Sequence, residues 1–545
     1  MASMMTMNSM PNGDTTTTMM MKKKKKTLKI ACCSVPHSGH MNPIMSLVQG
    51  LVSKRDNIIN NNEDNYEYTY EICVFTFGED GHTKYQKQCD ELKVNISISH
   101  IDGLHTNNDM IKLDLDSKKF PFPTFADRWK PLLEKELNKF QPTIIVCDLM
   151  TLNPQEYAHK HNITLVINTP GPMHIIPAFT LPVNLEGNGV NGYAIAFGGL
   201  YISFKAIDLF GFLSFFNIKD WGNFTKRTRT NIFGNNNTIV LVNSFWGLEK
   251  PRLFVPPNIM MVGPIMPPLR SKLEFPRTHP VLHTFLVQAR NENKKVLLVT
   301  TGSLIRMEEW LVKLLYNAFC NLNNNCVVVW SLKQEQQEYI INLNEEHNSK
   351  FHFSSWLPQP SLLASDYIDG VITHCGWGGT LECIAGGKPI GVLPFFGDQP
   401  GNAQLLLDTG CATSLGHIPK FNGDSSGHSA YKNDGISITQ EGITEGCHRL
   451  LEESTCRENA KRLQSLACDN PNMGCNAACD QIILALHNGV SHLCDSKKYL
   501  QLTGHRPFAF TFIFGVIAIA AAYGAVAVYI SMADHRTASM VGGEF

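Results

Sequence analysis

The sequence predicts an α/β protein with two doubly wound domains that face each other across a cleft, plus one membrane-spanning helix near the C-terminus. Short β-branched runs such as "YEICVFTF", "PTIIVCD", "KKVLLVTTGS" and "GVITHCG" are each followed by a segment with helical spacing, which is typical of parallel βα units. Two such series occur on either side of a proline-rich stretch, and 545 residues are enough for two domains.

Composition sets the expected domain boundaries. Residues 1–26 are rich in Met, Thr and Asn and end in a run of lysines, so they have too little apolar content to pack and are expected to form a disordered tail. Proline continues neither a helix nor a strand, and "PPNIMMVGPIMPPLRSKLEFPRTHP" therefore predicts a linker over 256–293. The first domain is then 27–255 and the second 294–490.

The last apolar segment, 508–532, has the length of a membrane span. It carries no ionisable group except tyrosine hydroxyls, and as a helix it is about 37 Å long. Lys497, Lys498 and Arg506 precede it, and positive flanks stay on the cytosolic side, so we expect a single-pass protein of the endoplasmic reticulum whose large domains face the cytosol and whose tail, 533–545, lies across the membrane. The alternative is that the true N-terminus carries a signal that this sequence lacks.

Charge and cysteine usage narrow the classes of partner. A net charge of -1 creates no field that attracts a polyanion, so a nucleic-acid partner is not expected and a compact ligand is favoured. The sixteen cysteines form no even framework, and pairs such as Cys475 and Cys479 lack the second half of a zinc-ligand set. We interpret the cysteines as mostly reduced, buried or inert.

A glycine-rich turn in the second domain is the first candidate site. "VITHCGWGGTLECIAGG" indicates a strand, a turn and a helix that starts near Thr380, so free backbone N–H groups and the positive helix end meet just after His374. Gly376, Gly378 and Gly379 allow close approach of a ligand to the backbone. This arrangement fits a phosphate or diphosphate, although such turns often serve packing alone.

The residues around this turn fit other parts of one ligand. Trp356 offers a flat face for a base, and Glu382 can accept hydrogen bonds from ribose hydroxyls. Asp398 and Gln399 can bind sugar hydroxyls. The structural alternatives are a core Trp, a helix-capping Glu and an Asp at a helix N-terminus.

The stretch from Trp356 to Gln399 resembles the signature box of the UDP-glycosyltransferases. The plant form of that box runs from Trp to Gln over 44 positions, and the stretch here has the same length. "WLPQ" and the C-terminal apolar segment look more like the animal branch, whereas "HCGW" is similar to the plant one. By this resemblance Trp356 stacks on uracil beside Gln359, His374 contacts the diphosphate, Glu382 the ribose, and Asp398 with Gln399 the sugar. The full set of UDP-sugar-binding residues that the resemblance implies is Thr301, Ser303, Trp356, Gln359, His374, Gly376, Trp377, Gly378, Gly379, Thr380, Glu382, Asp398 and Gln399.

This chain departs from the plant pattern at one place. Plant members commonly have Asn-Ser after "HCGW", where this chain has Gly378 and Gly379. The departure removes a phosphate-facing hydroxyl, which puts donor affinity or sugar choice in doubt, and Thr380 could partly replace it.

The first domain is expected to supply a general base. "VPHSGHMNP" ends the first strand, and its His40 resembles the catalytic His of the family; Asp148 ends a later strand, where the family keeps an Asp that orients this His. The alternatives are an ordinary loop histidine and a turn aspartate, and His37 is given no role. Asp114 and Asp116 match an acidic metal-binding triplet of another glycosyltransferase fold, but we interpret them as a solvated loop.

The resemblance implies a GT-B-like fold of two Rossmann-like domains and an inverting transfer of a hexose, glucose or glucuronic acid, from a UDP-sugar to a hydroxyl of a small lipophilic acceptor such as a phenol or sterol. No metal and no other cofactor is expected, because the helix end, His374 and backbone amides would assist departure of UDP. The alternatives are a membrane-anchored UDP-sugar-binding protein or regulatory subunit without turnover, and a nucleotide-sugar epimerase.

Overall fold

The computed structural model describes most of the two expected domains. The predicted membrane segment 508–532 and the tail 533–545 lie outside the described residues, as do Ser303, Asp114 and Asp116. Within the described part, no helix is both long and apolar enough to cross a membrane. The described residues are 24–58, 66–78, 84–101, 121–173, 227, 230–232, 234, 236–251, 255–267, 275–302, 305–323, 325–343, 349–395, 398–417, 431 and 433–494.

The first domain is built on a seven-stranded parallel sheet with the order β3-β2-β1-β4-β5-β6-β7. The order reverses between β1 and β4, as in doubly wound folds, where ligands bind at the carboxyl ends of the strands. The strands are β1 Lys24–Cys33, β2 Tyr66–Phe77, β3 Asn95–Ser99, β4 Ile144–Asp148, β5 Thr164–Thr169, β6 Thr238–Val242 and β7 Ile259–Met261, and the helices are α1 Ser38–Ile58, α2 Gln86–Leu92, α4 Pro121–Phe140 and α5 Leu152–Lys160.

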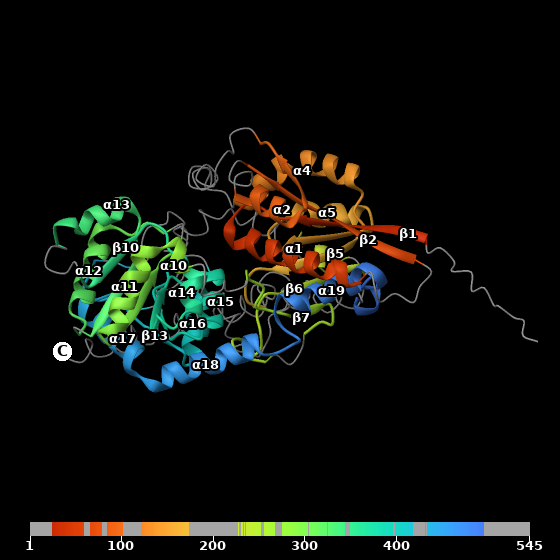
Figure 1. The fold of residues 1–545 in the computed structure, drawn as a ribbon. Coiled ribbons are helices and arrows are strands. Elements are labelled where there is room, and N and C mark those ends of the chain that lie inside the picture. The colour runs from red at the N-terminus through yellow and green to blue at the C-terminus, as the bar shows by residue number, and fades with distance from the viewer. Residues whose placement is uncertain are drawn as a thin grey trace, which may run out of the picture.

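The second domain repeats this plan with a six-stranded parallel sheet of order β10-β9-β8-β11-β12-β13. Figure 1 shows the two sheets in separate lobes of the molecule. Its strands are β8 Lys295–Thr300, β9 Cys326–Ser331, β10 Phe351–Ser354, β11 Gly370–Thr373, β12 Ile390–Val392 and β13 Ala412–Ser414. Its helices are α10 Phe275–Thr278, α11 Pro280–Asn291, α12 Glu309–Cys320, α13 Gln334–Gln337, η3 Glu338–Leu343, α14 Gln359–Ala364, α15 Trp377–Ala385, α16 Gln399–Asp408, α17 Gln440–Glu452 and α18 Ser454–Cys468.

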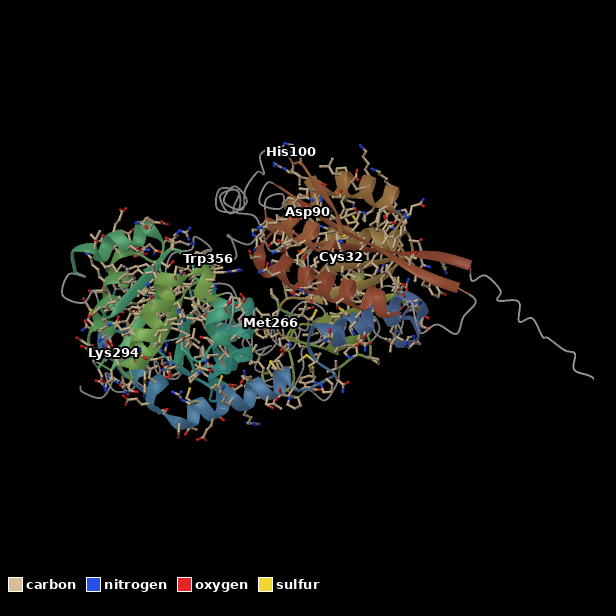
Figure 2. The ribbon with its side chains drawn as sticks, viewed as in Figure 1. Cys32, Asp90, His100, Met266, Lys294 and Trp356 are labelled. Atoms are coloured by element: carbon tan, nitrogen blue, oxygen red, sulfur yellow. The ribbon has the colours of Figure 1, made fainter. Side chains whose placement is uncertain are left out.

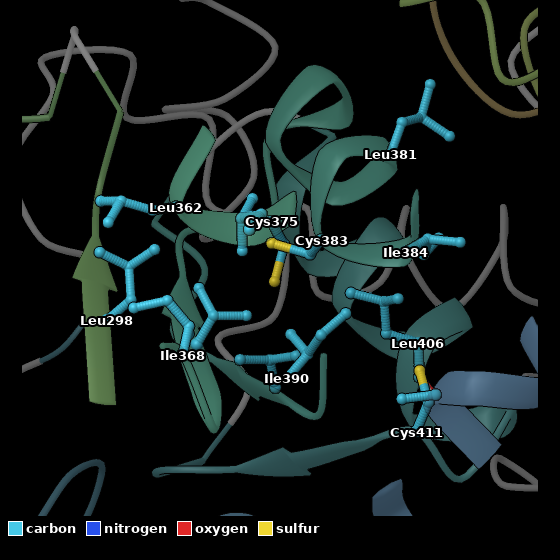
Figure 3. Packing of buried hydrophobic residues seen from close by; sticks show 14 of the residues in the cluster. Leu298, Leu362, Ile368, Cys375, Leu381, Cys383, Ile384, Ile390, Leu406 and Cys411 are labelled. Carbon is cyan, nitrogen blue, oxygen red and sulfur yellow. The ribbon is translucent and has the colours of Figure 1, made fainter. Parts of the chain in front are cut away.

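Helices cover both faces of each sheet, which is why the strands are apolar along their whole length. In β4 all five residues are buried: Ile145 and Cys147 pack in the cluster that includes α4 and α5, whereas Ile144 and Val146 pack in the one that includes α1. Figure 3 shows a core of the second domain, in which Leu298 of β8 lies in the same cluster as residues of α14, α15 and β12. The prediction of two doubly wound α/β domains is thus confirmed.

Three expected boundaries differ from the structure. β1 begins at Lys24, inside the predicted tail, because it pairs in register with β2 from Tyr66 onward. The stretch interpreted as a linker over 256–293 is divided: β7 completes the first sheet, and α11 packs into the core of the second domain.

The end of the chain as described returns to the first domain. Helix α19, Gly474–Asn488, follows α18 and was expected to belong to the second domain, whereas the short η4, Ser491–Leu493, lies just beyond the expected end of that domain at 490. The apolar face of α19 instead packs with α1, β1 and β4 of the first domain. Figure 1 shows this blue helix beside the red and orange elements. The two domains are therefore joined by helices α18 and α19, which lead from the second domain back to the first, as well as by the stretch after β7.

Candidate active site

A His-Asp pair lies at the carboxyl edge of the first sheet. β1 and β4 are neighbours with Cys33 opposite Cys147, so the loop after β1 and the end of β4 meet at one edge. His40 is in the first turn of α1, directly after that loop, and Asp148 is the last residue of β4. Nδ1 of His40 lies 3.0 Å from Oδ1 of Asp148. The two side chains are therefore at hydrogen-bond distance, and their role as a catalytic dyad stays a prediction.

Asp148 is held as a buried anion. Its carboxylate accepts hydrogen bonds from the backbone N–H of Met150 at 2.8 Å and from the hydroxyls of Ser34, at 3.3 Å, and Thr151. Burial alone would raise the pKa of Asp148. The charge of His40, together with hydrogen bonds from His40, Thr151 and Met150, outweighs burial and holds the pKa below its ordinary value. An ionised Asp148 fixes Nδ1 of His40 as the protonated nitrogen and turns Nε2 away from the carboxylate.

His37 lies next to this pair without sharing its carboxylate. Its ring centroid is 6.4 Å from that of His40. Burial, followed by the nearby His40, lowers the pKa of His37 to about 4, so this imidazole is neutral at ordinary pH. Of the two histidines in "VPHSGH", His40 is therefore the one paired with the Asp148 carboxylate.

The glycine turn of the second domain is packed around His374. A Cβ on Gly376 would lie 2.4 Å from Nε2 of His374, and a Cβ on Gly302 would lie 2.7 Å from its Cε1, so both positions need glycine. Burial lowers the pKa of His374 to about 4, and a hydrogen bond with the backbone of Thr300 opposes this shift. A neutral imidazole next to the N-terminus of α15 can donate a hydrogen bond to a phosphate oxygen.

Gly378 and Gly379 are different, because nothing forces glycine there. A Cβ on Gly378 would meet no atom within 4 Å, and one on Gly379 would lie 3.6 Å from Nε2 of Gln359. Thr380 is fully buried, and its hydroxyl has no partner. The departure from Asn-Ser thus leaves open space at the turn, and Thr380 sits inside the protein rather than in that space.

Gln359 and Glu382 form one hydrogen-bonded chain with the end of β8. The hydroxyl of Thr300 donates to the amide oxygen of Gln359 at 2.8 Å, and the amide nitrogen donates to Oε2 of Glu382 at 2.7 Å. Burial raises the pKa of Glu382 to about 7, against the effect of the hydrogen bond from Gln359. Gln359 therefore orients the carboxyl group of Glu382.

The two tryptophans of the motif have opposite environments. The Trp356 side chain is 66% exposed, which is incompatible with a core residue, and Figure 2 shows it on the side of the second domain turned toward the first. Trp377 is buried, and its indole N–H donates to the backbone oxygen of Asn243 in the first domain at 2.7 Å. The Trp377 indole thus joins the two domains, and the place of Trp377 in the UDP-sugar-binding set stays a prediction.

A residue that sequence reasoning missed lies against Trp356. The imidazole of His279, the residue just before α11, is 5.5 Å from the indole ring at an interplanar angle of 30°. Nδ1 of His279 lies 2.9 Å from the hydroxyl of Thr278, which holds the ring in place. His279 belongs to the stretch interpreted as a linker, and no local pattern links it to a tryptophan far along the chain.

The start of α16 faces the dyad from the other domain. Asp398 precedes this helix, and its carboxylate accepts a hydrogen bond from Asn402 at 2.7 Å. Desolvation by the surrounding protein raises the pKa of Asp398. The hydrogen bond from Asn402 and the charge of His40 oppose this shift. The charge of His40, in the first domain, thus acts on the Asp398 carboxyl group of the second domain.

Gln399 and Thr301 are more enclosed than Asp398. Gln399 is only 5% exposed, and its amide oxygen accepts a hydrogen bond from the N–H of Phe395 at 2.9 Å. Thr301 is buried just after β8, beside Gly302. In the part of the chain that the structure describes, no group of three or more His, Cys, Asp or Glu residues lies close enough together to hold a metal ion.

Comparison with known proteins identifies the family of the chain. The family model for UDP-glucoronosyl and UDP-glucosyl transferase matches residues 223–520, more than half of the chain. Among curated proteins, a UDP-glycosyltransferase of Talaromyces amestolkiae is 26% identical over 254 residues, 43% of each chain. UDP-glucuronosyltransferase 2B14 of Oryctolagus cuniculus is 26% identical over 260 residues, 46% of this chain and 42% of the relative. The alignments thus span less than half the length of these relatives.

Solved structures share the fold over a longer part of the chain. The rice protein Os79, solved with U2F and a trichothecene, superposes with a TM-score of 0.60 at 16% identity and covers 84% of this chain and 100% of its own. UGT71G1 of Medicago truncatula, solved with UDP-glucose, superposes with a TM-score of 0.58 at 15% identity over 84% of this chain and 98% of its own. With the family model matched over residues 223–520, the chain belongs to the UDP-glucoronosyl and UDP-glucosyl transferase family.

Proposed function

We propose that the protein is an inverting UDP-dependent glycosyltransferase that moves a hexose, glucose or glucuronic acid, to a hydroxyl of a small lipophilic acceptor. The observation that carries the proposal is the pair of His40 and Asp148, with 3.0 Å between Nδ1 and Oδ1. This pair lies within electrostatic reach of Asp398, at the candidate donor site of the other domain. A base that faces a sugar site is what hydroxyl attack on a sugar requires.

In this reaction Nε2 of His40 takes the proton of the acceptor hydroxyl as its oxygen attacks the anomeric carbon. The bond between that carbon and the diphosphate breaks on the opposite face, so the configuration inverts. The buried Asp148 carboxylate stabilises the imidazolium that forms. His374, the turn amides and the N-terminus of α15 stabilise the charge on the departing UDP, and the scheme requires neither a metal ion nor another cofactor.

The donor is proposed to lie along the second domain. Trp356 would stack on uracil, Glu382 would bind the ribose, and Asp398 with Gln399 would hold the sugar. The exposure of the Trp356 indole supports its role, as does the chain of hydrogen bonds that orients Glu382. Relatives named as glucuronosyltransferase and anthocyanidin 3-O-glucosyltransferase support both sugars as candidates.

A UDP-sugar-binding protein without turnover is the second candidate. The open space at Gly378 and Gly379 favours it, because this turn lacks side chains that would grip the diphosphate. A pure binding protein has no need of a buried carboxylate that orients a histidine, and this is why the transferase is preferred.

The membrane arrangement is part of the proposal. We place 508–532 across the membrane and the two domains on its cytosolic side, on the strength of the apolar segment and its positive flank. Protease treatment of sealed microsomes should digest the domains without detergent, and their protection would reverse this orientation.

Incubation with mixed substrates tests the activity. The purified full chain is given UDP-glucose or UDP-glucuronic acid with a mixture of phenols and sterols, and products are identified by mass spectrometry. We expect a mass gain of one hexosyl or glucuronosyl unit on a hydroxyl acceptor, absent from a matched His40→Ala sample. Binding of UDP by calorimetry without any product from the whole set would favour the binding protein.

A further inference from the structure

Two cysteines of α19 meet the backbone of α1. The thiol of Cys475 lies 3.0 Å from the backbone oxygen of Ser46, and the thiol of Cys479 lies 3.5 Å from that of Leu47. The cysteines are four residues apart on one helix, so they share a face. That face is pressed against the helix that carries His40 in its first turn.

A glycine in α1 makes room for both sulfur atoms. A Cβ on Gly50 would lie 2.6 Å from Sγ of Cys479 and 3.1 Å from Sγ of Cys475. Glycine inside a helix is less stable than alanine, so this position needs a reason. The close approach of the two sulfurs supplies one, and it also shows that they border the same small space.

Cys475 differs chemically from all other cysteines of the chain. It lies in the first turn of α19, where the positive helix end favours a thiolate, and Lys54 of α1 adds a positive charge. The hydrogen bond from Cys479 and the charge of Lys54 lower the pKa of Cys475, and burial opposes this shift. The same hydrogen bond, burial and the charge of Asp480 raise the pKa of Cys479, and Lys54 pairs with Asp480 beside them. Outside this pair, burial raises the pKa of every cysteine.

We propose that Cys475 and Cys479 form a reactive dithiol site that takes oxidants of the peroxide class, with Cys475 as the attacking thiol and Cys479 as the resolving one. The Cys475 thiolate attacks one peroxide oxygen, becomes a sulfenic acid and releases hydroxide. The sulfur of Cys479 then attacks the sulfur of the sulfenic acid, the S–O bond breaks, and the proton of Cys479 leaves with the hydroxyl as water. Two electrons pass from the two thiols to the peroxide, and a disulfide remains.

Helix geometry allows this bond. Residues four apart on an α-helix have Cα atoms about 6 Å apart, within the range of roughly 4.4–6.8 Å found for disulfides. Their Cβ atoms are farther apart than a disulfide prefers, so the first turn of α19 has to tighten or unwind. In the disulfide neither sulfur carries a proton, and both contacts to the α1 carbonyls are lost.

Oxidation is therefore coupled to the helix that carries the base. We expect a several-fold fall in kcat on oxidation with unchanged UDP affinity, since the donor residues lie on the other domain; this expectation rests on the proposed function. The chemistry of the thiols does not, so labelling separates the two.

Competitive alkylation tests the site directly. The native full chain is treated with substoichiometric iodoacetamide at neutral pH, and the modified cysteines are identified by fragmentation mass spectrometry. Cys468 is the internal control, because it is exposed whereas Cys475 is half-buried. Exposure alone would label Cys468 first, and the proposal requires Cys475 to be labelled several-fold faster. Faster labelling of Cys468 overturns it.

Hydrogen peroxide completes the test. The wild-type chain should form a disulfide between Cys475 and Cys479, and a Cys479→Ser variant should instead accumulate a sulfenic acid at Cys475 that dimedone captures. Cys475→Ser should give neither product, and matching melting temperatures show that both variants are folded. Absence of the disulfide in the oxidised wild type contradicts the dithiol site. An unchanged kcat in a fully oxidised sample contradicts the coupling of the site to α1.

Discussion

Replacing Asp148 by Asn isolates the charge of the dyad from its geometry. The carboxylate has two hydrogen-bonded sides: Oδ1 accepts from His40 and Met150, and Oδ2 accepts from the hydroxyls of Ser34 and Thr151. An asparagine oxygen can keep the first pair, because hydroxyls rotate and can accept from an amide on the second side. Asp148→Asn should therefore fold with His40 still oriented, and lose only the negative charge.

The size of the loss follows from the distance between the two groups. Unit charges about 4 Å apart interact by about 4 kcal/mol at an effective dielectric constant near 20. Asp148 is fully buried, so solvent screens this interaction little. If the transition state carries most of the imidazolium charge, kcat should fall by roughly 10³-fold.

Single-turnover kinetics with a saturating UDP-sugar gives the measurement, and calorimetry with UDP serves as the control for folding and donor binding. We expect the large fall in kcat with UDP affinity unchanged. A loss below tenfold would show that Asp148 does not stabilise a charged His40 and would refute the role given to the dyad.

Three further changes probe the donor side. Burial raises the pKa of Glu382 to about 7, so its carboxylate becomes protonated as the pH falls from 8 to 6. The dissociation constant of UDP should then rise by up to roughly tenfold over this pH range. The same pH profile in a Glu382→Gln variant would contradict the assignment of Glu382 to the donor. His279→Ala should weaken UDP binding by roughly two- to tenfold, because the ring packed on Trp356 is lost, and His279→Phe should bind UDP like the wild type. Equal UDP affinities by calorimetry in the wild type and both variants would show that His279 does not support Trp356. The double variant Gly378→Asn with Gly379→Ser should fold with an unchanged melting temperature, because the space is open, and should bind UDP more tightly; a lower melting temperature or weaker binding would refute the free space at the turn.

The sequence was sufficient for the parallel sheets and for the dyad. Alternating βα patterns determine the layers, and a sequence displays this periodicity directly. The pairing of His40 with Asp148, 108 residues away, was expected from the resemblance to the UDP-glycosyltransferases, and the structure explains it because the carboxyl ends of the neighbouring strands β1 and β4 share an edge.

What the sequence did not reveal depends on tertiary packing. The apolar face of α19 is visible in the sequence, but its choice of the first domain is not, because either sheet could cover such a face. Trp356 and Trp377 occur in one motif, yet the first is exposed and the second is buried at a domain contact with Asn243. The contact of His279 with Trp356 likewise arises only when α11 is docked.

The role of His40 as the base is the central claim, and one comparison tests it most directly: product formation and UDP binding measured side by side for the wild type and His40→Ala. Removing a general base costs roughly 10²- to 10⁴-fold in rate, and His40 is assigned no contact with the donor nucleotide. We predict a loss of product formation in that range with a UDP dissociation constant within a few-fold of wild type. Product formation by His40→Ala at the wild-type rate would contradict the account.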